Sequence, residues 1–571
     1  MSDCPDGRMP YAHLSPTPRG QPMDTSRLFR TSGTLAATAA LLISAAVSGA
    51  AASAAAAPGA AAARPRGVGE PGSFASLLPP EAADEQGPLP ELAPLPAALP
   101  RALRPYYDQR LAWHSCGGKR ADFECATLRA PLDYEAPRSH DDVKLAVSRK
   151  KATGPGKRLG ALMVNPGGPG GSAIGFLQEY AASSYPGAVR AQYDMVAMDP
   201  RGVAASQPVT CLSDKEMDAY AQVDTTPDDA AEVRELVASF KKFAQGCAAR
   251  SGKLLGHVST VEAARDMDVL RAVLGDDKLH YVGASYGTFL GATYAGLFPS
   301  RVGRLVLDGA MDPALDARRI NRDQTAGFQT ALASFAADCA QHEDCPLEGG
   351  RTDVAGVRLQ QFFQRLDQHP LDTGTPRRLT ESLATTGVIS AMYDETTWPI
   401  LRKALHNAQT GDGALLLRLS DLYYERDQRG HYTNLMPANS AVNCLDLPPA
   451  FRGPAAVRRA VPDFEKASPA LGASFAWSAL SCAYWPVRAT GGPHRIPARG
   501  AAPILVVGTT RDPATPYPWA RALASQLSSG RLLTYDGDGH TAYTRGSRCV
   551  DGAINDYLLT GTPPPASRHC S

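Results

Sequence analysis

A Gly-x-Ser-x-Gly pentapeptide that directly follows an apolar run constrains this chain more than any other feature. The run begins at Leu279, and the pentapeptide reads Gly283-Ala284-Ser285-Tyr286-Gly287. A strand that turns sharply into a helix would hold the serine on a strained backbone, with its hydroxyl at the edge of a sheet. The glycines are needed because a Cβ there would collide with the neighbouring strand or helix. Glycine and serine are common in turns, so the pattern has weight only if the chain supplies partners for Ser285.

Two later apolar runs end in the polar residues that such a serine would need. Residues 503–508 are followed by Asp512, and residues 531–535 are followed by His540. Alternation of strands with helices predicts an α/β fold with a mostly parallel sheet. Loops at the carboxyl edge of such a sheet converge, so residues far apart in the chain can meet there. The order serine, aspartate, histidine is that of a hydrolytic triad in this type of fold.

Each predicted triad member has a physical task. His540 would take the proton of the Ser285 hydroxyl and then protonate the leaving group, while Asp512 would orient the imidazole and stabilise its protonated form. We also weigh other residues against these two. Four further aspartates end strands or stand close to His540: Asp199, Asp308, Asp536 and Asp538. Two further histidines are His114, which precedes Cys116 by two residues, and His280, which lies inside a predicted strand.

A glycine-rich loop follows another apolar run, residues 159–164. It reads Asn-Pro-Gly-Gly-Pro-Gly-Gly-Ser over residues 165–172. Glycines let backbone N–H groups face inward, as the binding of an oxyanion requires. We predict that the N–H groups of Gly168 and Tyr286 form an oxyanion hole, although a purely structural turn is equally compatible with the loop alone. No Gly-Lys-Ser/Thr follows, so this is not a nucleotide-binding P-loop.

Helical patterns dominate residues 313–497, which contain no strong strand signal. We interpret this stretch as a helical lid inserted between two parts of the core, residues 106–312 and 498–571. A length of 571 residues is compatible with such an insertion. At the N-terminus, Arg27 and Arg30 precede an uncharged run and small residues, which predicts a signal peptide over residues 1–54, with Met23 a possible start. The Ala- and Pro-rich residues 55–105 are predicted to be a linker or pro-segment.

The cysteines agree with export from the cell. Cys4 would leave with the signal peptide, and an even number remains: Cys116, Cys125, Cys211, Cys247, Cys339, Cys345, Cys444, Cys482, Cys549 and Cys570. An even number in an exported chain predicts disulfides. Pairing neighbours in order gives bridges 116–125, 211–247, 339–345, 444–482 and 549–570, but the sequence leaves the connectivity open. No Cys-x-x-Cys or paired Cys/His spacing supports a metal cluster instead.

Charge and hydropathy exclude several kinds of partner. The formal net charge is +1, and no basic block is present, so we expect neither nucleic acid nor an anionic membrane as a partner. The apolar run of the signal peptide is too short for a stable membrane span. The sequence does not indicate an oligomeric state.

Five ordered motifs together resemble one family. Residues 165–172, 199–202, 283–287, 511–516 and 537–540 resemble the secreted tripeptidyl aminopeptidases of actinomycetes, which are prolyl-aminopeptidase-like serine peptidases of the α/β-hydrolase superfamily. The match covers roughly residues 106–570. Residues 202–206 read Gly-Val-Ala-Ala-Ser where many relatives have Gly-Val-Gly-x-Ser, which removes no catalytic group. The oxyanion loop begins with Asn-Pro where prolyl iminopeptidases have His, and this favours the tripeptidyl branch.

The resemblance implies an extracellular exopeptidase that removes short peptides from free N-termini of peptides or proteins. No metal or organic cofactor is needed for this chemistry. A carboxylate in the lid would have to receive the substrate ammonium group, and Asp446, Glu425 and Glu343 are candidates between which the sequence does not choose. Two other readings remain open: a secreted esterase or other ester or amide hydrolase with the same triad, and a non-catalytic binding relative of the fold.

Overall fold

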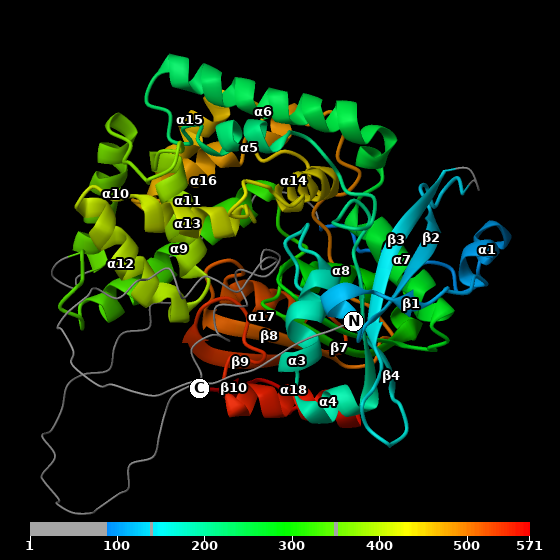
Figure 1. Cartoon of the computed structure of the whole chain (residues 1–571). Coiled ribbons are helices and arrows are strands. Elements are labelled where there is room, and N and C mark those ends of the chain that lie inside the picture. Colours follow the sequence, from blue (N-terminus) through cyan, green and yellow to red (C-terminus); the bar gives the residue numbers. More distant parts are fainter. Residues whose placement is uncertain (1–87, 138–140, 348–351) are drawn as a thin grey trace, which may run out of the picture. The chain divides into compact units, whose positions relative to one another are not determined.

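A sheet in the order β1-β2-β3-β5-β4-β6-β7-β8-β9-β10 forms the centre of the molecule (Figure 1). The computed structural model describes residues 88–137, 141–347 and 352–571. The strands are β1 His114–Ser115, β2 Glu124–Pro131, β3 Asp142–Lys150, β4 Gly160–Asn165, β5 Tyr193–Met198, β6 Leu279–Ala284, β7 Val302–Asp308, β8 Ile504–Arg511, β9 Gly530–Asp538 and β10 Arg568–Cys570. Pairing is antiparallel from β1 to β5 and parallel from β5 to β10. The predicted, mostly parallel α/β-hydrolase sheet is confirmed.

Helices cover both faces of this sheet because its central strands are apolar on both sides. Every residue of β4 and of β5 is buried, as expected for strands that helices cover on both faces. Met163 of β4 packs in the cluster with α7 and α8, whereas Val164 packs in the cluster with α18. The core helices are α1 Arg104–Tyr107, α2 Ala173–Phe176, α3 Ala182–Ser184, α4 Gly187–Gln192, α7 Thr260–Val273, α8 Tyr286–Leu297, α17 Tyr517–Gln526 and α18 Arg548–Thr560.

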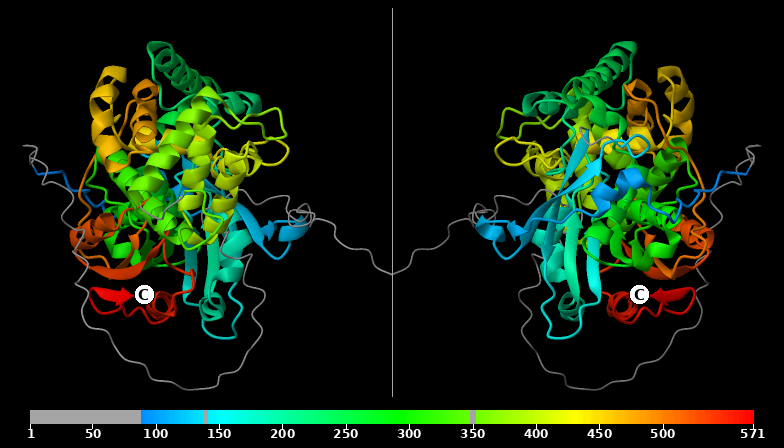
Figure 2. Two further views of the ribbon diagram at one scale, coloured as in Figure 1. Left: turned by 90° about the vertical axis from the view of Figure 1, so that its left-hand side faces the viewer. Right: turned by 90° about the vertical axis from the view of Figure 1, so that its right-hand side faces the viewer.

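The lid, residues 313–497, is helical in its described part and has a hydrophobic core of its own. Its helices are α9 Ala317–Cys339, α10 Thr352–Gln368, α11 Glu381–Met392, α12 Trp398–Gln409, α13 Ala414–Tyr423, α14 Leu435–Asp446, α15 Pro454–Ala467 and α16 Gly472–Ser478. Phe335 of α9, Val388 of α11 and Leu401 of α12 lie in that core. In Figure 2 the lid helices, coloured yellow-green to orange, lie together on one side of the sheet.

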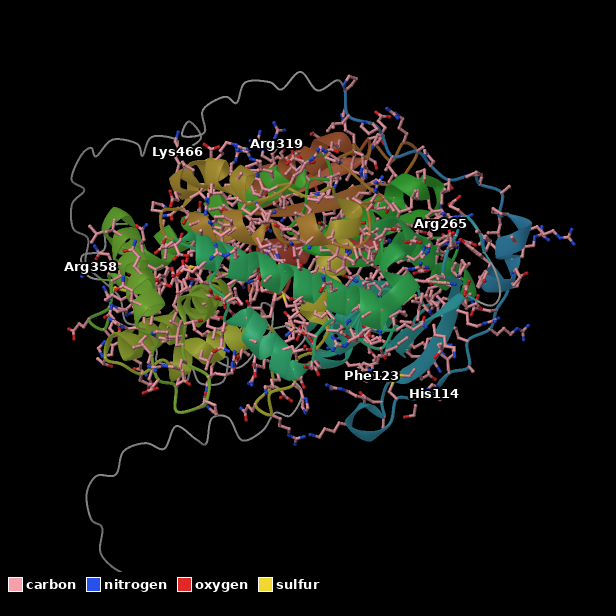
Figure 3. All side chains as sticks on the ribbon, turned by 90° about the horizontal axis from the view of Figure 1, so that it is seen from above. His114, Phe123, Arg265, Arg319, Arg358 and Lys466 are labelled. Atoms are coloured by element: carbon pink, nitrogen blue, oxygen red, sulfur yellow. A yellow bond between two sulfur atoms is a disulfide. The ribbon has the colours of Figure 1, made fainter. Side chains whose placement is uncertain are left out.

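Two helices from the first half of the chain also belong with the lid. α5 (Asp214–Ala221) and α6 (Ala230–Ser251) stand between β5 and α7 in the sequence. Phe240 of α6 packs with Phe464 of α15 and Trp477 of α16 in one buried cluster. In Figure 3, α6 crosses the view in front of the other helices, and side chains fill the spaces between the ribbons. The apolar face of α6 is therefore shared, because Phe240 is buried by lid helices whereas Phe243 and Cys247 pack in the main core cluster with sheet residues.

Residues before Tyr106 contact the core, although residues 55–105 were predicted to be a linker. The Leu92 amide donates a hydrogen bond to the Arg495 carbonyl (2.8 Å), and the Leu95 amide donates one to the Leu297 carbonyl (2.9 Å). Leu92 packs against Gly296 at the end of α8 and lies so close that a Cβ on that glycine would be 2.8 Å from Leu92 Cδ2. The described end of the predicted linker is thus docked by backbone pairing. The predicted signal peptide and Cys4 lie outside the described residues.

The five disulfides of the described residues join neighbouring cysteines in chain order. They are Cys116–Cys125, Cys211–Cys247, Cys339–Cys345, Cys444–Cys482 and Cys549–Cys570. This confirms the predicted disulfides and settles the connectivity. Within the described parts of the chain, none of the helices combines the length and the apolar character that crossing a membrane requires.

Candidate active site

Ser285 occupies the sharp turn between β6 and α8. Its backbone has φ 57° and ψ −126°, a region that non-glycine residues rarely adopt. The Ser285 amide donates to the Asp308 carbonyl of β7 (2.9 Å). A Cβ on Gly283 would lie 2.4 Å from the Gly287 carbonyl oxygen, and one on Gly287 would lie 2.9 Å from the carbonyl oxygen of Asn165. The strained turn that the pentapeptide predicts is present, with Ser285 partly exposed.

His540 and Asp512 form a buried hydrogen-bonded pair. His540 Nδ1 lies 2.8 Å from Asp512 Oδ1 and 3.0 Å from Oδ2. The amides of Ala514 and Thr515 donate to Asp512 Oδ1 (both 2.9 Å), and the Thr541 amide donates to Oδ2 (3.1 Å). The Thr515 hydroxyl donates to the same carboxylate (3.1 Å). These donors stabilise the ionised carboxylate in the interior, as orienting a histidine requires.

The His540 ring lies beside the backbone that anchors Ser285. A Cβ on Gly309 would be 3.3 Å from His540 Cε1. Gly309 directly follows Asp308, whose carbonyl accepts the Ser285 amide. His540 Nε2 is buried and has no hydrogen-bond partner among the described residues. The structure therefore brings the three predicted triad residues to one edge of the sheet and leaves the proton-accepting nitrogen of the histidine unused.

The other aspartates considered from the sequence each have different partners. Asp199 accepts the Ser172 hydroxyl (2.8 Å) and the Ile174 amide (3.0 Å), and so holds the end of the glycine loop. Asp536 and Asp538 both pair with Arg511 (2.8 and 2.9 Å). Among the described aspartates that end strands or stand close to His540, Asp512 alone contacts a ring nitrogen of His540.

Asp308 holds the loop that carries His540. Its carboxylate accepts the Ala542 amide (3.0 Å) and the Tyr543 amide (2.8 Å). Burial raises the pKa of Asp308 to about 6, and the two amides lower it against that trend. The sequence indicates Asp308 only as the polar end of a strand, because its partners are backbone groups of a loop more than two hundred residues away. Its contacts give it a positioning role.

The two other histidines considered from the sequence are His114 and His280. His114 is exposed on β1, and burial lowers the pKa of His280 to about 4. His280 Nδ1 accepts the Arg304 amide (3.1 Å) within the sheet. Neither histidine lies on the loops that carry Ser285 and Asp512.

The glycine loop lies directly against the serine turn. A Cβ on Gly167 would be 2.9 Å from both Ser285 Cβ and the Tyr286 amide nitrogen. Gly168 has φ 116°, a left-handed conformation suited to glycine. The loop is fixed by the Gly167 amide, which donates to Asn165 Oδ1 (2.9 Å), and by the Gly171 amide, which donates to the Gly167 carbonyl (3.2 Å). These bonds do not use the N–H groups of Gly168 and Tyr286, the predicted oxyanion donors.

Lid helices contact two of the loops at this edge. A Cβ on Gly327 of α9 would be 2.4 Å from the Pro513 carbonyl oxygen, so α9 crosses the Asp512 loop at backbone contact. Gln324 of α9 also donates to the Ala514 carbonyl (2.8 Å). From α14, Asn439 Nδ2 donates to the Pro169 carbonyl of the glycine loop (3.1 Å). No sequence motif predicted these contacts, because each joins a helix surface to a backbone carbonyl.

The three lid carboxylates named from the sequence have different environments. Glu343 is exposed in the loop closed by the Cys339–Cys345 disulfide. Both oxygens of Asp446 accept bonds from Thr260, at the N-terminus of α7 (2.8 and 2.5 Å), and desolvation raises its pKa to about 7. Glu425 is buried, and the Thr433 hydroxyl donates to it. Burial raises the pKa of Glu425 to about 8, and the nearby Glu179 carboxylate adds to the shift.

One carboxylate group among the described residues has a spacing that would suit a cation. Asp224, Glu232 and Asp367 have oxygens within 4.8 Å of one another. Glu232 lies on α6 and Asp367 on α10, so none of the group is on a loop that carries the candidate triad.

Comparisons with known proteins find relatives over most of the chain. The family described as TAP-like protein matches residues 468–570. Serine protease Hip1 of Mycobacterium tuberculosis is 37% identical over 498 residues, which cover 82% of this chain and 92% of that protein. A protein of the same species named carboxylesterase B is 41% identical over 474 residues, covering 81% and 90%. Tripeptidyl aminopeptidase of Streptomyces coelicolor is 32% identical over 484 residues, covering 81% and 86%.

Proposed function

The chain belongs to the TAP-like family of α/β-hydrolases and is a serine hydrolase, and from this premise we propose that it is a secreted exopeptidase that releases tripeptides from free N-termini. The identity to a tripeptidyl aminopeptidase and to a serine protease supports a peptide substrate. The disulfides, which are typical of exported proteins, support an extracellular or cell-envelope location.

The geometry supports an acyl-enzyme mechanism. The Ser285 hydroxyl attacks the carbonyl carbon of the scissile peptide while His540 Nε2 takes its proton, and Asp512 stabilises the imidazolium. The oxyanion accepts hydrogen bonds from the Gly168 and Tyr286 amides, each donor contributing roughly 3 kcal/mol to barrier lowering. His540 then protonates the leaving amine, and the C–N bond breaks. Water, deprotonated by the same nitrogen, attacks the ester to release the peptide and restore Ser285.

Glu425 is the observation that favours a substrate with a free amine. It is 6% exposed, and none of the described lysines, arginines or histidines pairs with it. An ionised carboxylate without a cation is unfavourable in the interior. A substrate ammonium group would supply the missing charge through a charge-assisted hydrogen bond.

The place of Glu425 in the lid fits a role in substrate binding. The Thr433 amide donates to the Glu425 carbonyl (3.2 Å). Two residues further along, the Leu435 carbonyl oxygen lies where it would be 2.6 Å from a Cβ on Gly170 of the glycine loop. Glu179, the second carboxylate, is on η6 (Leu177–Ala181), which follows the same loop. The acidic pair therefore belongs to segments that adjoin the glycine loop, and we propose Glu425 as the amine acceptor.

A panel of chromogenic substrates tests the proposal. We expect the full-length enzyme to hydrolyse a tripeptidyl p-nitroanilide much faster than the matching aminoacyl p-nitroanilide. Acetylation of the tripeptide should abolish most of the activity, because the ammonium group is lost. Equal rates on the free and acetylated tripeptides would contradict exopeptidase action.

A secreted esterase is the alternative that one observation favours, namely the 41% identity to a protein named carboxylesterase B. Fast hydrolysis of p-nitrophenyl acyl esters without release of tripeptides would support it. A non-catalytic binding relative is the more remote alternative. Hydrolysis by the purified protein that persists unchanged in Ser285→Ala would point to a contaminant and support that reading.

A further inference from the structure

The loop that carries His540 is bound by the lid as well as by the sheet. The His540 amide donates to the Tyr393 carbonyl (2.8 Å), which lies in the lid directly after α11. The Tyr393 ring also meets the His540 ring edge-on, with centroids 5.5 Å apart and planes at 83°. The lid therefore contacts both the backbone and the imidazole of the candidate general base.

Arg545 strengthens this connection from the histidine loop. Its side chain is 6% exposed and its Nη1 donates to three carbonyls of the same loop, those of Asp538, His540 and Thr541 (3.2, 3.3 and 3.2 Å). Its Nη2 donates to Asp394 Oδ1 (3.2 Å) and to the Glu395 carboxylate of the lid. One guanidinium group thus gathers the loop carbonyls on one side and two lid carboxylates on the other.

The surroundings of Arg545 are built for this contact. Gly539 has φ 89°, and a Cβ there would lie 2.5 Å from Arg545 Nη1 and 2.8 Å from Glu395 Oε2. Any side chain at position 539 would therefore push the ion pair apart. The Asp394 side chain is 2% exposed, and the buried guanidinium of Arg545 compensates its charge. Asp394 Oδ1 also accepts the Thr396 amide (2.9 Å), which fixes its orientation.

We propose that Arg545 is a positioning residue for the general base, and that the lid segment Tyr393–Glu395 sets the orientation of His540 through it. The lid and the base then form one rigid unit at this point. This inference rests on the proposed role of His540.

Replacing Arg545 with alanine tests the inference. A misplacement of the base by roughly 1 Å costs about 100-fold in rate, so we expect Arg545→Ala to lower kcat about 100-fold with a small change in KM. Arg545→Ala also removes a positive charge beside the histidine loop, so the acid limb of the kcat/KM profile should move. Added guanidinium ion, at concentrations that do not unfold the protein, should restore part of the activity by refilling the site.

A matched arginine in the lid controls for loss of a buried ion pair. Arg402 has an 8% exposed side chain and pairs with Asp338 (2.8 Å), but it does not contact the histidine loop in the described structure. Arg402→Ala should keep kcat and the pH profile, and guanidinium should have no effect on it. The milder Glu395→Gln variant should keep the fold and lower kcat by less than Arg545→Ala.

Two results would overturn the inference. One is an Arg545→Ala enzyme whose kcat is within twofold of the wild-type value and whose pH profile is unchanged. The other is an activity loss that equals the loss of folded protein and is not rescued by guanidinium. Either result leaves the proposed function intact, which instead fails if His540→Ala retains full activity.

Discussion

Two regions of the molecule meet at the candidate site, and they hold its loops by different means. On the sheet side, aspartates at strand ends accept backbone amides of the loops: Asp199 for the glycine loop and Asp308 for the histidine loop. On the lid side, the glycine loop and the Asp512 loop are held through their carbonyls, by Asn439 and by Gln324. The sheet side thus holds its loops with carboxylates that accept backbone amides. The lid side holds its loops mainly through single hydrogen bonds from neutral side chains, and the ion pair of Arg545 with the lid carboxylates is the exception.

The difference separates chemistry from substrate choice. The sheet-side anchors stand at the ends of β5 and β7, two strands of the same parallel sheet, so the register of the sheet fixes them together. The lid-side anchors come from helices and loops that can change without altering that register. The relatives of this chain are named as peptidases and as a carboxylesterase, and one fold can carry sites for different substrates.

The largest expected effect comes from a substitution on the sheet side, at Asp512. We expect Asp512→Asn to lower kcat about 10⁴-fold, because the amide favours the wrong imidazole tautomer. Asp538→Asn, in the same region but paired with Arg511, should change kcat little. Steady-state rates on a tripeptidyl p-nitroanilide measure both. Similar rates for the two variants would mean that Asp512 is not the orienting acid.

The next prediction for the sheet side concerns Asp308 and the pH dependence of the free energy of unfolding. Its pKa in the folded protein is about 6, above the ordinary 3.8, so the folded state binds the proton more tightly than the unfolded state. This group's contribution to the free energy of unfolding is therefore full below pH 4 and declines as pH rises towards 6, by up to about 3 kcal/mol. Asp308→Asn should remove that decline. Urea unfolding from pH 4 to 7 tests it, and an unchanged pH slope would contradict it.

Glu425 probes the lid side. We expect Glu425→Gln to raise KM for free tripeptides about 30-fold, because a charged hydrogen bond contributes roughly 2 kcal/mol, while the slow acetylated substrate is unaffected. Glu343→Gln is the matched exposed control and should behave as the wild type. Initial rates on the substrate pair give the comparison. Equal losses on both substrates would place Glu425 in the fold and not in amine binding.

The smallest expected effect is at Asn439. Loss of its bond to the Pro169 carbonyl should cost about 1 kcal/mol, or roughly fivefold in kcat, because the oxyanion loop is less fixed. Asn321→Ala on α9, where the side chain bonds within its own helix, serves as control. If Asn439→Ala matches that control in kcat, α14 covers the loop without positioning it.

The sheet was largely predictable because its signals are local. Apolar runs such as residues 159–164 are buried on both faces, and the Gly-x-Ser-x-Gly turn needs only neighbours in sequence to be recognised. The residues placed at its edge, Asp512 and His540, follow from strand order. The role of Asp308 was not predictable, since its partners are amides of residues 542 and 543, and backbone groups leave no trace in the sequence.

The lid was predictable only as a helical region. The sequence does not show that Tyr393 contacts His540 or that Arg545 pairs with Asp394. A buried ion pair requires only two opposite charges, which can stand any number of residues apart in the chain. The packing of α6 with lid helices was also not predictable. An amphipathic pattern shows that a helix has an apolar face, but it does not show which element covers that face. Residues 88–105 read as a linker because proline and alanine mask their backbone pairing.

The packing of α6 against α15 and α16 limits how the lid can be removed or exchanged. The lid is assembled from two insertions, one after β5 and one after β7, and part of the apolar surface of each is buried in one shared cluster. Deleting either one alone would expose Phe240 or Phe464 and Trp477 to water. A lidless or exchanged version would have to replace both insertions together. The two segments therefore pack in part as one structural unit, although the nucleophile strand separates them in the chain.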